Sequence, residues 1–558
     1  MLLKKKIYIF PIILIIALLA VSNFVFFRID LTSEKRHSIS TTTKNLMKNA
    51  EFPIEATLFL DGNLNSGFRN LRKSTLEILN EMSVYSSSGI HIEKVNPSKS
   101  EDAEERNHIY AAMEAEGMTA TAIYERTKDG KSAQTVVFPW LQITYGNRSI
   151  NVNLLKNIRG NSGEENLNIS IENLEFEITD AIRRLVNTEV RKIAFLEGHG
   201  ELTEAETYDI SRELSNYFQI DRGTLSDDAT ILNEYKAVII ARPQEKFSEA
   251  EKYIIDQYIM NGGRVFWLLD AVQTDMEALS SSGVSPTMAL DLNLSDMLFK
   301  YGVRFEPVLL QDVQSAVVPV NIAPQGEQPQ FEPMPWFFAP LLLTSPESAI
   351  TKNVAEVRGE FVSMLNPVGE SENHFTVLLA TSNNSHIVPT PNIIDLSNMP
   401  DAQDRNYFAH GYLPVAMLIE GEFASNFENR MKPKEINYSF PFIAKSLPTR
   451  QIFVANGNII RNETTGIASD STTLPLGYDR FMQTRFGNLE FVQNAVLYLT
   501  DDDNWLSLRN RTFKLRLLNK QLVNENRVII QTVNIALPLL LLLVCGLLYR
   551  VQSSKFKK

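Results

Sequence analysis

The sequence predicts an α/β protein in which two transmembrane helices flank a large soluble part made of two α/β units. Two observations lead to this fold class. Uncharged apolar runs lie near both ends, at Ile7–Phe27 and Val528–Tyr549, and each is long enough to cross a hydrocarbon core of roughly 30 Å. Between them, short apolar strand patterns alternate with segments of helical periodicity. This alternation is typical of α/β architecture.

The first apolar run has two possible interpretations. Three lysines, Lys4 to Lys6, precede it, and Ala20-Val21-Ser22 resembles the cleavage site of a secretory signal peptide. The run nevertheless continues as far as Phe27, beyond the usual length of a signal peptide's apolar region. This length favours a retained membrane anchor.

The second run carries polar and helix-disturbing residues in its first half, namely Gln531, Asn534 and Pro538. Polar groups in hydrocarbon tend to find partners on neighbouring helices. These three residues are therefore candidate contacts with a partner inside the membrane. Two spans would place both ends of the chain on one side and residues 28–527 on the other. The Lys and Arg residues near the two runs do not decide which side that is.

The first soluble unit, residues 28–187, is predicted to follow the order βαβα and then to form hairpins. This order resembles a thioredoxin-like layer. The sole cysteine, Cys545, lies in the second apolar run, so no Cys-x-x-Cys chemistry, disulfide or cysteine zinc site is expected. The predicted elements are strand Ile54–Leu60, a helix from Phe68 to Met82, strand Ile90–Val95, helix Glu101–Glu116, hairpins turning at Lys128–Lys131 and Gly146-Asn147, and helix Ser170–Val186.

The second unit, residues 188–500, is predicted to be a larger Rossmann-like domain whose parallel sheet is covered on both faces. Capping boxes at Thr203-x-x-Glu206 and Ser248-x-x-Glu251 mark two helix starts. The proline-rich segment Ser315–Pro346 is expected to be a long surface loop anchored by Trp336 to Phe338. The predicted strands are Lys192–Glu197, Gln219–Leu225, Ala237–Ala241, Arg264–Leu269, Phe361–Leu365, Phe375–Ala380 and Gln451–Ala455.

The turn after the first strand of this unit holds the candidate ligand or interface residues Glu197, His199 and Glu201. Ligands of α/β sheets bind at the carboxyl ends of parallel strands, where this turn is predicted to lie. An acid/base or metal cluster is one interpretation, and exposed turn residues are the other. The spacing Gly198-x-Gly200 partly matches a dinucleotide-binding turn. Glu201 and the acidic residues after it would repel a pyrophosphate, so we expect no cofactor, and no ligand-like histidine spacing indicates a metal site.

A basic helix over residues 501–527 is expected to precede the second span, and 528–558 then forms that span and a tail. Its Arg509, Arg511 and Arg516 are candidate contacts with a membrane partner or with anionic lipid, although an ordinary connecting helix fits equally well. The net charge of −12 argues against nucleic acid as a partner.

Three segments, in this order, resemble the gliding-motility ABC-transporter auxiliary protein family, GldG, of Bacteroidetes-type bacteria. They are Phe195 to Glu201, Gly421 to Phe427, and the run from Leu474 through Phe486-Gly487-Asn488 to Arg509. The resemblance implies a non-catalytic subunit of the inner membrane, two-pass, with its bulk in the periplasm. It also implies a polytopic permease subunit and a cytoplasmic ATPase subunit as partners, a link to gliding, and an amidotransferase-like second unit without the nucleophilic cysteine.

Two alternatives to the accessory subunit remain open at this point. One is an envelope hydrolase that uses Glu197 or His199. The other is a structural tether for secretion or motility machinery.

Overall fold

The computed structural model describes residues 38–126, 132–187, 189–321, 323, 328, 330–369, 373–436, 441–465, 472–510 and 526–555. The chain divides into two compact units, Met1–Arg511 and Thr512–Lys558. The predicted first span, Ile7–Phe27, lies outside the described residues, and so does most of the basic segment before α12.

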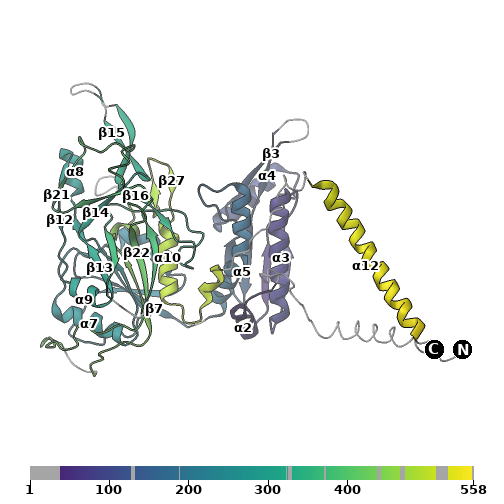
Figure 1. The fold of residues 1–558 in the computed structure, drawn as a ribbon, viewed down its shortest axis with the longest axis horizontal. Coiled ribbons are helices and arrows are strands. Elements are labelled where there is room, and N and C mark those ends of the chain that lie inside the picture. Colours follow the sequence, from purple (N-terminus) through teal and green to yellow (C-terminus); the bar gives the residue numbers. More distant parts are fainter. Residues whose placement is uncertain are drawn as a thin grey trace. The chain divides into compact units, whose positions relative to one another are not determined.

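The amino-terminal part of the larger unit is a small mixed sheet with strand order β2-β1-β5-β6. Strand β1 is parallel to β2 and antiparallel to β5, which pairs with β6 in a hairpin. Helices α3 and α5 run beside each other against it and share its core (Figure 1). The elements are α2 (Thr41–Asn49), β1 (Ile54–Leu58), α3 (Ser66–Tyr85), β2 (Ile90–Lys94), α4 (Ala103–Ala115), the hairpin β3 (Thr121–Arg126) and β4 (Ser132–Val137), β5 (Trp140–Tyr145), β6 (Arg148–Asn153) and α5 (Gly163–Val186).

Helix α2 was not predicted, and the order of the other elements agrees with the order predicted from the sequence. The main difference is the start of α5, which begins at Gly163 rather than at Ser170. Ser162 and Glu165 form a reciprocal capping box there, with bonds of 3.2 Å and 2.7 Å to each other's backbone N–H groups. The cap satisfies helix donors that would otherwise be unpaired, and it adds two turns to the predicted helix.

A ten-stranded mixed sheet forms the centre of the second part. Strands β8, β7, β9, β10 and β23 are parallel neighbours. The sheet then continues with antiparallel β22, β19, β16 and β15, and β17 pairs with β16. The bounds are β7 (Arg191–Leu196), β8 (Phe218–Gly223), β9 (Ala237–Ala241), β10 (Val265–Leu268), β15 (Ser315–Asn321), β16 (Phe331–Thr344), β17 (Val357–Arg358), β19 (His374–Ala380), β22 (Pro414–Gly421) and β23 (Thr449–Val454).

Both faces of the parallel strands are buried, as predicted. Alternate residues such as Ile193 and Phe195 face a core shared with α6 (Tyr208–Leu214) and α10 (Asn488–Leu499). Ala194 and Leu196 face the other core, which α7 (Glu249–Met260) and α9 (Ser295–Lys300) cover. The two-residue period of a strand explains why its residues divide between two cores.

The proline-rich segment differs from the prediction. Instead of a surface loop, it forms β15 and β16, which pair antiparallel and extend the large sheet. Pro319 lies opposite Pro333 in this ribbon, where β15 is the outermost strand. Edge strands tolerate proline because one side of the strand needs no N–H donor. The predicted aromatic anchor is correct, since Trp336, Phe337 and Phe338 are buried.

Several smaller elements were not predicted, and two predicted boundaries shift. The strand expected at Phe361–Leu365 is β18 (Met364–Pro367), and the helix expected to begin at Thr203 begins at Tyr208 after a 3₁₀ turn, Ala205–Thr207. The remaining elements are β11 (Val272–Gln273), α8 (Met276–Ser282), β12 (Val284–Ala289), β13 (Val303–Glu306), β14 (Val308–Asp312), β20 (Ser385–Pro389), β21 (Asn392–Asp395), β24 (Thr464–Thr465), β25 (Thr472–Thr473), β26 (Tyr478–Asp479), β27 (Thr484–Arg485) and the 3₁₀ turns Gly457–Ile460 and Trp505–Asn510.

The second unit contains α12 (Arg527–Lys555). Within the described residues, α12 is the one helix long and apolar enough to cross a membrane, and its window Arg527–Val544 has a mean hydropathy of 2.0. The two-span prediction is thus supported for its second span.

Candidate functional site

The candidate site lies where the chain order reverses in the parallel sheet. From β7 the chain continues to β8 on one side, and it then returns to β9 on the other side of β7. Ligands of open α/β sheets bind outside the carboxyl ends of the strands at such a point. The turn after β7 carries Glu197, His199 and Glu201, and the loop after β9 begins at Arg242.

The His199 side chain occupies this position and is itself enclosed. Its ring stacks on Phe247 with centroids 3.8 Å apart. Its Nδ1 lies 3.2 Å from Oε1 of Glu201, and its Nε2 lies 3.2 Å from Oε1 of Glu251. Only 6% of the side chain is exposed. The carbonyl of His199 also accepts bonds from the N–H groups of Gln244 and Glu245, so the residue joins the β7 turn to the β9 loop.

Two carboxylates raise the pKa of this histidine. Burial lowers the pKa of His199, but the hydrogen bonds and charges of Glu201 and Glu251 outweigh burial, and the net pKa is raised. Burial alone would raise the pKa of Glu251, whereas its bonds to Ser248 and His199 lower it overall. Both ring nitrogens of His199 face carboxylate oxygens at 3.2 Å, so neither is directed at open solvent.

Glu197 points away from this pair. Its Oε1 accepts a 2.7 Å bond from Nε of Arg222 on β8, and Arg222 also donates to the carbonyl of Leu202 at 2.7 Å. Glu201 instead accepts the backbone N–H of His199 at 2.7 Å. The structure therefore brings His199 and Glu201 together and directs Glu197 to the neighbouring strand.

The tight turn depends on its two glycines. Gly198 and Gly200 have φ angles of 117° and 72°, in the left-handed region that favours glycine. A Cβ atom on Gly200 would lie 3.3 Å from Cβ of Gln244. The close approach of the β7 and β9 loops leaves little room for a side chain at Gly200, and Thr224 lies 3.2 Å from a Cβ on Gly198.

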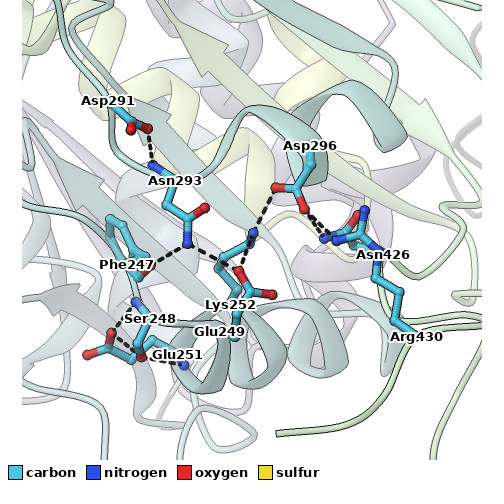
Figure 2. A network of polar contacts seen from close by, with 10 residues as sticks. All are labelled: Phe247, Ser248, Glu249, Glu251, Lys252, Asp291, Asn293, Asp296, Asn426 and Arg430. Atoms are coloured by element: carbon cyan, nitrogen blue, oxygen red, sulfur yellow. Dashed lines mark hydrogen bonds and ion pairs between the residues drawn. The ribbon is translucent and has the colours of Figure 1, made fainter.

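A polar network holds the backbone of Phe247, the residue whose ring stacks on His199 (Figure 2). Asn293 donates from Nδ2 to the carbonyl of Phe247 at 2.9 Å and to Oε1 of Glu249 at 3.1 Å. The Nζ of Lys252 lies 2.9 Å from Oε1 of Glu249 and 2.8 Å from Oδ1 of Asp296. Sequence reasoning found the Ser248-Glu251 capping box of this network but not its long-range members.

Asp296 is the centre of that network. Besides Lys252, it accepts bonds from Nδ2 of Asn426 at 3.1 Å and Nη1 of Arg430 at 2.5 Å. Burial would raise the pKa of Asp296, but these three donors lower it well below its usual range. The ionised carboxylate therefore ties α7, α9 and the 426–430 segment together (Figure 2).

A second group at the same sheet edge was not predicted. Arg242, with a φ of 58°, donates from Nε to Oδ2 of Asp270 at 2.9 Å. The other oxygen of Asp270 accepts the N–H of Gly457 at 2.7 Å. This bridge joins the ends of β9, β10 and β23. Its members are far apart in the sequence, so no local signal reveals them.

The membrane-partner candidates divide between the two units. Gln531, Asn534 and Pro538 are exposed on α12. Arg509 is buried in the larger unit, where its guanidinium lies 5.2 Å from the centroid of the Phe176 ring. Arg511 and Arg516 lie outside the described residues. Across the part of the chain that the structure describes, no three His, Cys, Asp or Glu side chains are arranged to hold a metal ion.

A family model described as an ABC-type uncharacterized transport system matches residues 190–495, from just before β7 into α10. This is more than half of the chain. The chain belongs to this transport-system family. The match confirms the resemblance to ABC-transporter auxiliary proteins, and it covers the whole parallel sheet.

Other comparisons add less to the family assignment. A model described as a domain of unknown function, DUF7088, matches residues 33–144. No curated protein matches the chain. Among solved structures, the mmIFT52 N-terminal domain is similar to 56% of this chain and 98% of its own length, with 12% identity and a TM-score of 0.30.

The charge on His199 makes folding sensitive to pH in this transport-system protein. The His199 pKa is raised in the folded state, so its stabilising effect is complete below the unfolded value of about 6.5. That effect is lost as the pH rises through the folded pKa. We expect His199→Asn to lower the unfolding midpoint more at pH 5.5 than at pH 8.5, measured by thermal denaturation. An equal loss at both pH values would contradict this assignment.

Proposed function

We propose that this protein is a membrane-anchored, non-catalytic accessory subunit of an ABC transporter, and that separate subunits supply the permease and the ATPase. The transport-system family supports the accessory role. In this proposal the larger unit lies in the periplasm, the chain has two membrane passes, and the system serves gliding motility. The resemblance described above motivates these three points.

The polar face of α12 is the observation that supports a permease partner. Gln531, Asn534 and Pro538 follow one another at three- and four-residue steps, so they share one face of the helix. Pro538 has no N–H, so the carbonyl of Asn534 loses its usual helical donor. Polar groups that face lipid are energetically costly, and hydrogen bonds to a neighbouring helix reduce that cost.

The enclosed His199 supports the accessory subunit over the hydrolase alternative. Its two ring nitrogens are both engaged by carboxylates, and Glu197 is paired with Arg222. A hydrolase would need one of these groups to be free for a substrate or a water.

A co-purification experiment tests the proposed permease contact. In the double variant Gln531→Leu/Asn534→Leu, we expect recovery of a polytopic partner from mild detergent to fall by about tenfold, because a loss of about 1.4 kcal/mol corresponds to that factor. The ATPase subunit should be lost together with the permease. Mass spectrometry of the purified complex measures both.

Thr532→Leu is the matched control. The Thr532 hydroxyl already donates to the carbonyl of Val528 at 2.7 Å within α12, so its removal should leave partner recovery unchanged. If the double variant recovers the permease as well as the wild type does, the polar face is not the contact. If the wild type recovers neither a permease nor an ATPase, the accessory role itself fails.

A further inference from the structure

A cavity rich in arginine lies where α5 leads into β7, away from the candidate site. Its volume is about 390 Å³, and it also borders β6, β8 and the end of α10. Its lining includes Arg148, Arg183, Arg184 and Arg191. The one acidic residue that lines it is Glu189. The side chains that line the cavity therefore carry more positive than negative charge.

The structure holds these arginines close together despite their like charges. Burial lowers the pKa of Arg183, Asp180 and Asp501 act against this, and the charge of Arg191 lowers the pKa further. The guanidinium of Arg183 also lies 4.5 Å from the centroid of the Trp505 ring. The fold therefore holds Arg183 against an aromatic ring and near a second cation, Arg191.

Two of these side chains have a buried donor that lacks an acceptor. The Nε atoms of Arg184 and Arg191 are buried and have no hydrogen-bond partner among the described residues. Their nearest carboxylates are only in ion-pair range, with Asp180 at 3.6 Å from Arg184 and Glu189 at 3.8 Å from Arg191. Oδ1 of Asp180 is likewise buried without a hydrogen-bond partner in the described part of the chain. A buried polar atom left unpaired costs about 1–3 kcal/mol, so the two arginines keep unmet hydrogen-bonding capacity.

Neutral polar groups complete the cavity. Asn187, Ser215, Asn216 and Gln219 also line it. Guanidinium groups match the geometry of phosphate oxygens and bind them in pairs of hydrogen bonds. Four arginines against one glutamate favour a ligand with more than one negative charge, such as a phosphate near neutral pH.

We propose that this arginine cavity binds a phosphate-bearing ligand, with Arg184 and Arg191 donating to its oxygens. The ligand would neutralise the cluster and connect the end of α5 to β7. Because α5 packs on the amino-terminal sheet and β7 lies in the large sheet, occupancy would stiffen the connection between the two sheets.

Calorimetric titration of the full chain in nanodiscs with inorganic pyrophosphate tests this proposal. We expect saturable binding below about 1 mM, and affinity weaker by about tenfold in Arg191→Gln, as the loss of a charge-assisted hydrogen bond predicts. Arg304→Gln is the matched control, because Arg304 is exposed on β13, pairs with Glu306 and does not line the cavity. Its affinity should stay within about twofold of wild type.

The variant Arg184→Lys separates a loss of binding from a loss of folding. This variant keeps the positive charge and loses the planar fork, so affinity should fall by at least about threefold while the unfolding midpoint is retained. Absence of saturable heat up to about 10 mM pyrophosphate would overturn the proposal. Unchanged binding in a folded Arg191→Gln or Arg184→Lys chain would overturn it as well.

The source of the phosphate is distinguished by the lipid composition. The titration is repeated in nanodiscs of phosphatidylcholine alone and in nanodiscs that contain phosphatidic acid. If phosphatidic acid weakens the apparent affinity for pyrophosphate, and if this weakening is absent in Arg191→Gln, the ligand is assigned as a lipid headgroup. Equal affinity in both membranes would assign a soluble phosphate compound.

Discussion

Replacing Lys252 with Ala is expected to lower the free energy of unfolding by about 2–4 kcal/mol. The Lys252 side chain is only 1% exposed, and its Nζ bridges Glu249 and Asp296. Removing it leaves Asp296, whose pKa is lowered well below its usual range, with fewer cations to stabilise its charge. Guanidinium denaturation, together with hydrogen exchange of the α7 amides, measures the loss.

Lys246→Ala is the matched control for this variant. Its Nζ lies 2.5 Å from Oδ2 of Asp291, but both side chains are about two-thirds exposed. Exposed ion pairs contribute at most about 1 kcal/mol, so Lys246→Ala should change little. Lys252→Met retains the buried aliphatic stem, so its loss of unfolding free energy should lie between those of Lys252→Ala and Lys246→Ala. Equal effects of Lys252→Ala and Lys246→Ala would show that burial does not govern the network in Figure 2.

Gly457→Ala is expected to destabilise the sheet edge by about 2–3 kcal/mol, since added atoms in a packed interior force strain. A Cβ on Gly457 would lie 2.4 Å from Cγ and 3.0 Å from Cα of Arg242. The displacement would also break the 2.7 Å bond from the Gly457 N–H to Asp270. Denaturant unfolding of the purified chain measures this effect.

A second substitution at Arg242 tests the steric origin of that loss. Arg242→Gly removes the clashing side chain, and the φ of 58° at this position suits glycine. The double variant Gly457→Ala/Arg242→Gly should be more stable than the sum of the single losses predicts. Gly223→Ala, with no atom within 4 Å of the added Cβ, is the neutral control. Strict additivity would indicate that the clash with Arg242 is not the cause.

Elements whose sequence signal lies within a few neighbouring residues were predicted correctly. The capping box at Ser248 and Glu251 marked the start of α7, and the apolar run Ala237–Ala241 coincides with β9. The prediction for 315–346 was wrong because its prolines do not exclude regular structure. A proline lacks the N–H donor, but an edge strand tolerates this loss, and the local sequence does not show which strand lies at a sheet edge.

The candidate site shows the same limit. Its turn was found because Gly198-His199-Gly200 follows an apolar strand directly. Which groups His199 meets was not predictable, because Glu251 and Phe247 come from another loop and helix. The cavity at Arg184 and Arg191 was missed for a related reason: Arg148 approaches them only when β6 packs beside the end of α5.

The sequence by itself determined the α/β class, the candidate membrane span α12 and the family, because periodicity, apolar length and ordered motifs are local properties of the chain. Only the tertiary structure decided that His199 is buried between two carboxylates and that four arginines share one cavity. Charge and burial depend on groups that are distant along the chain and meet only when the sheets and helices pack.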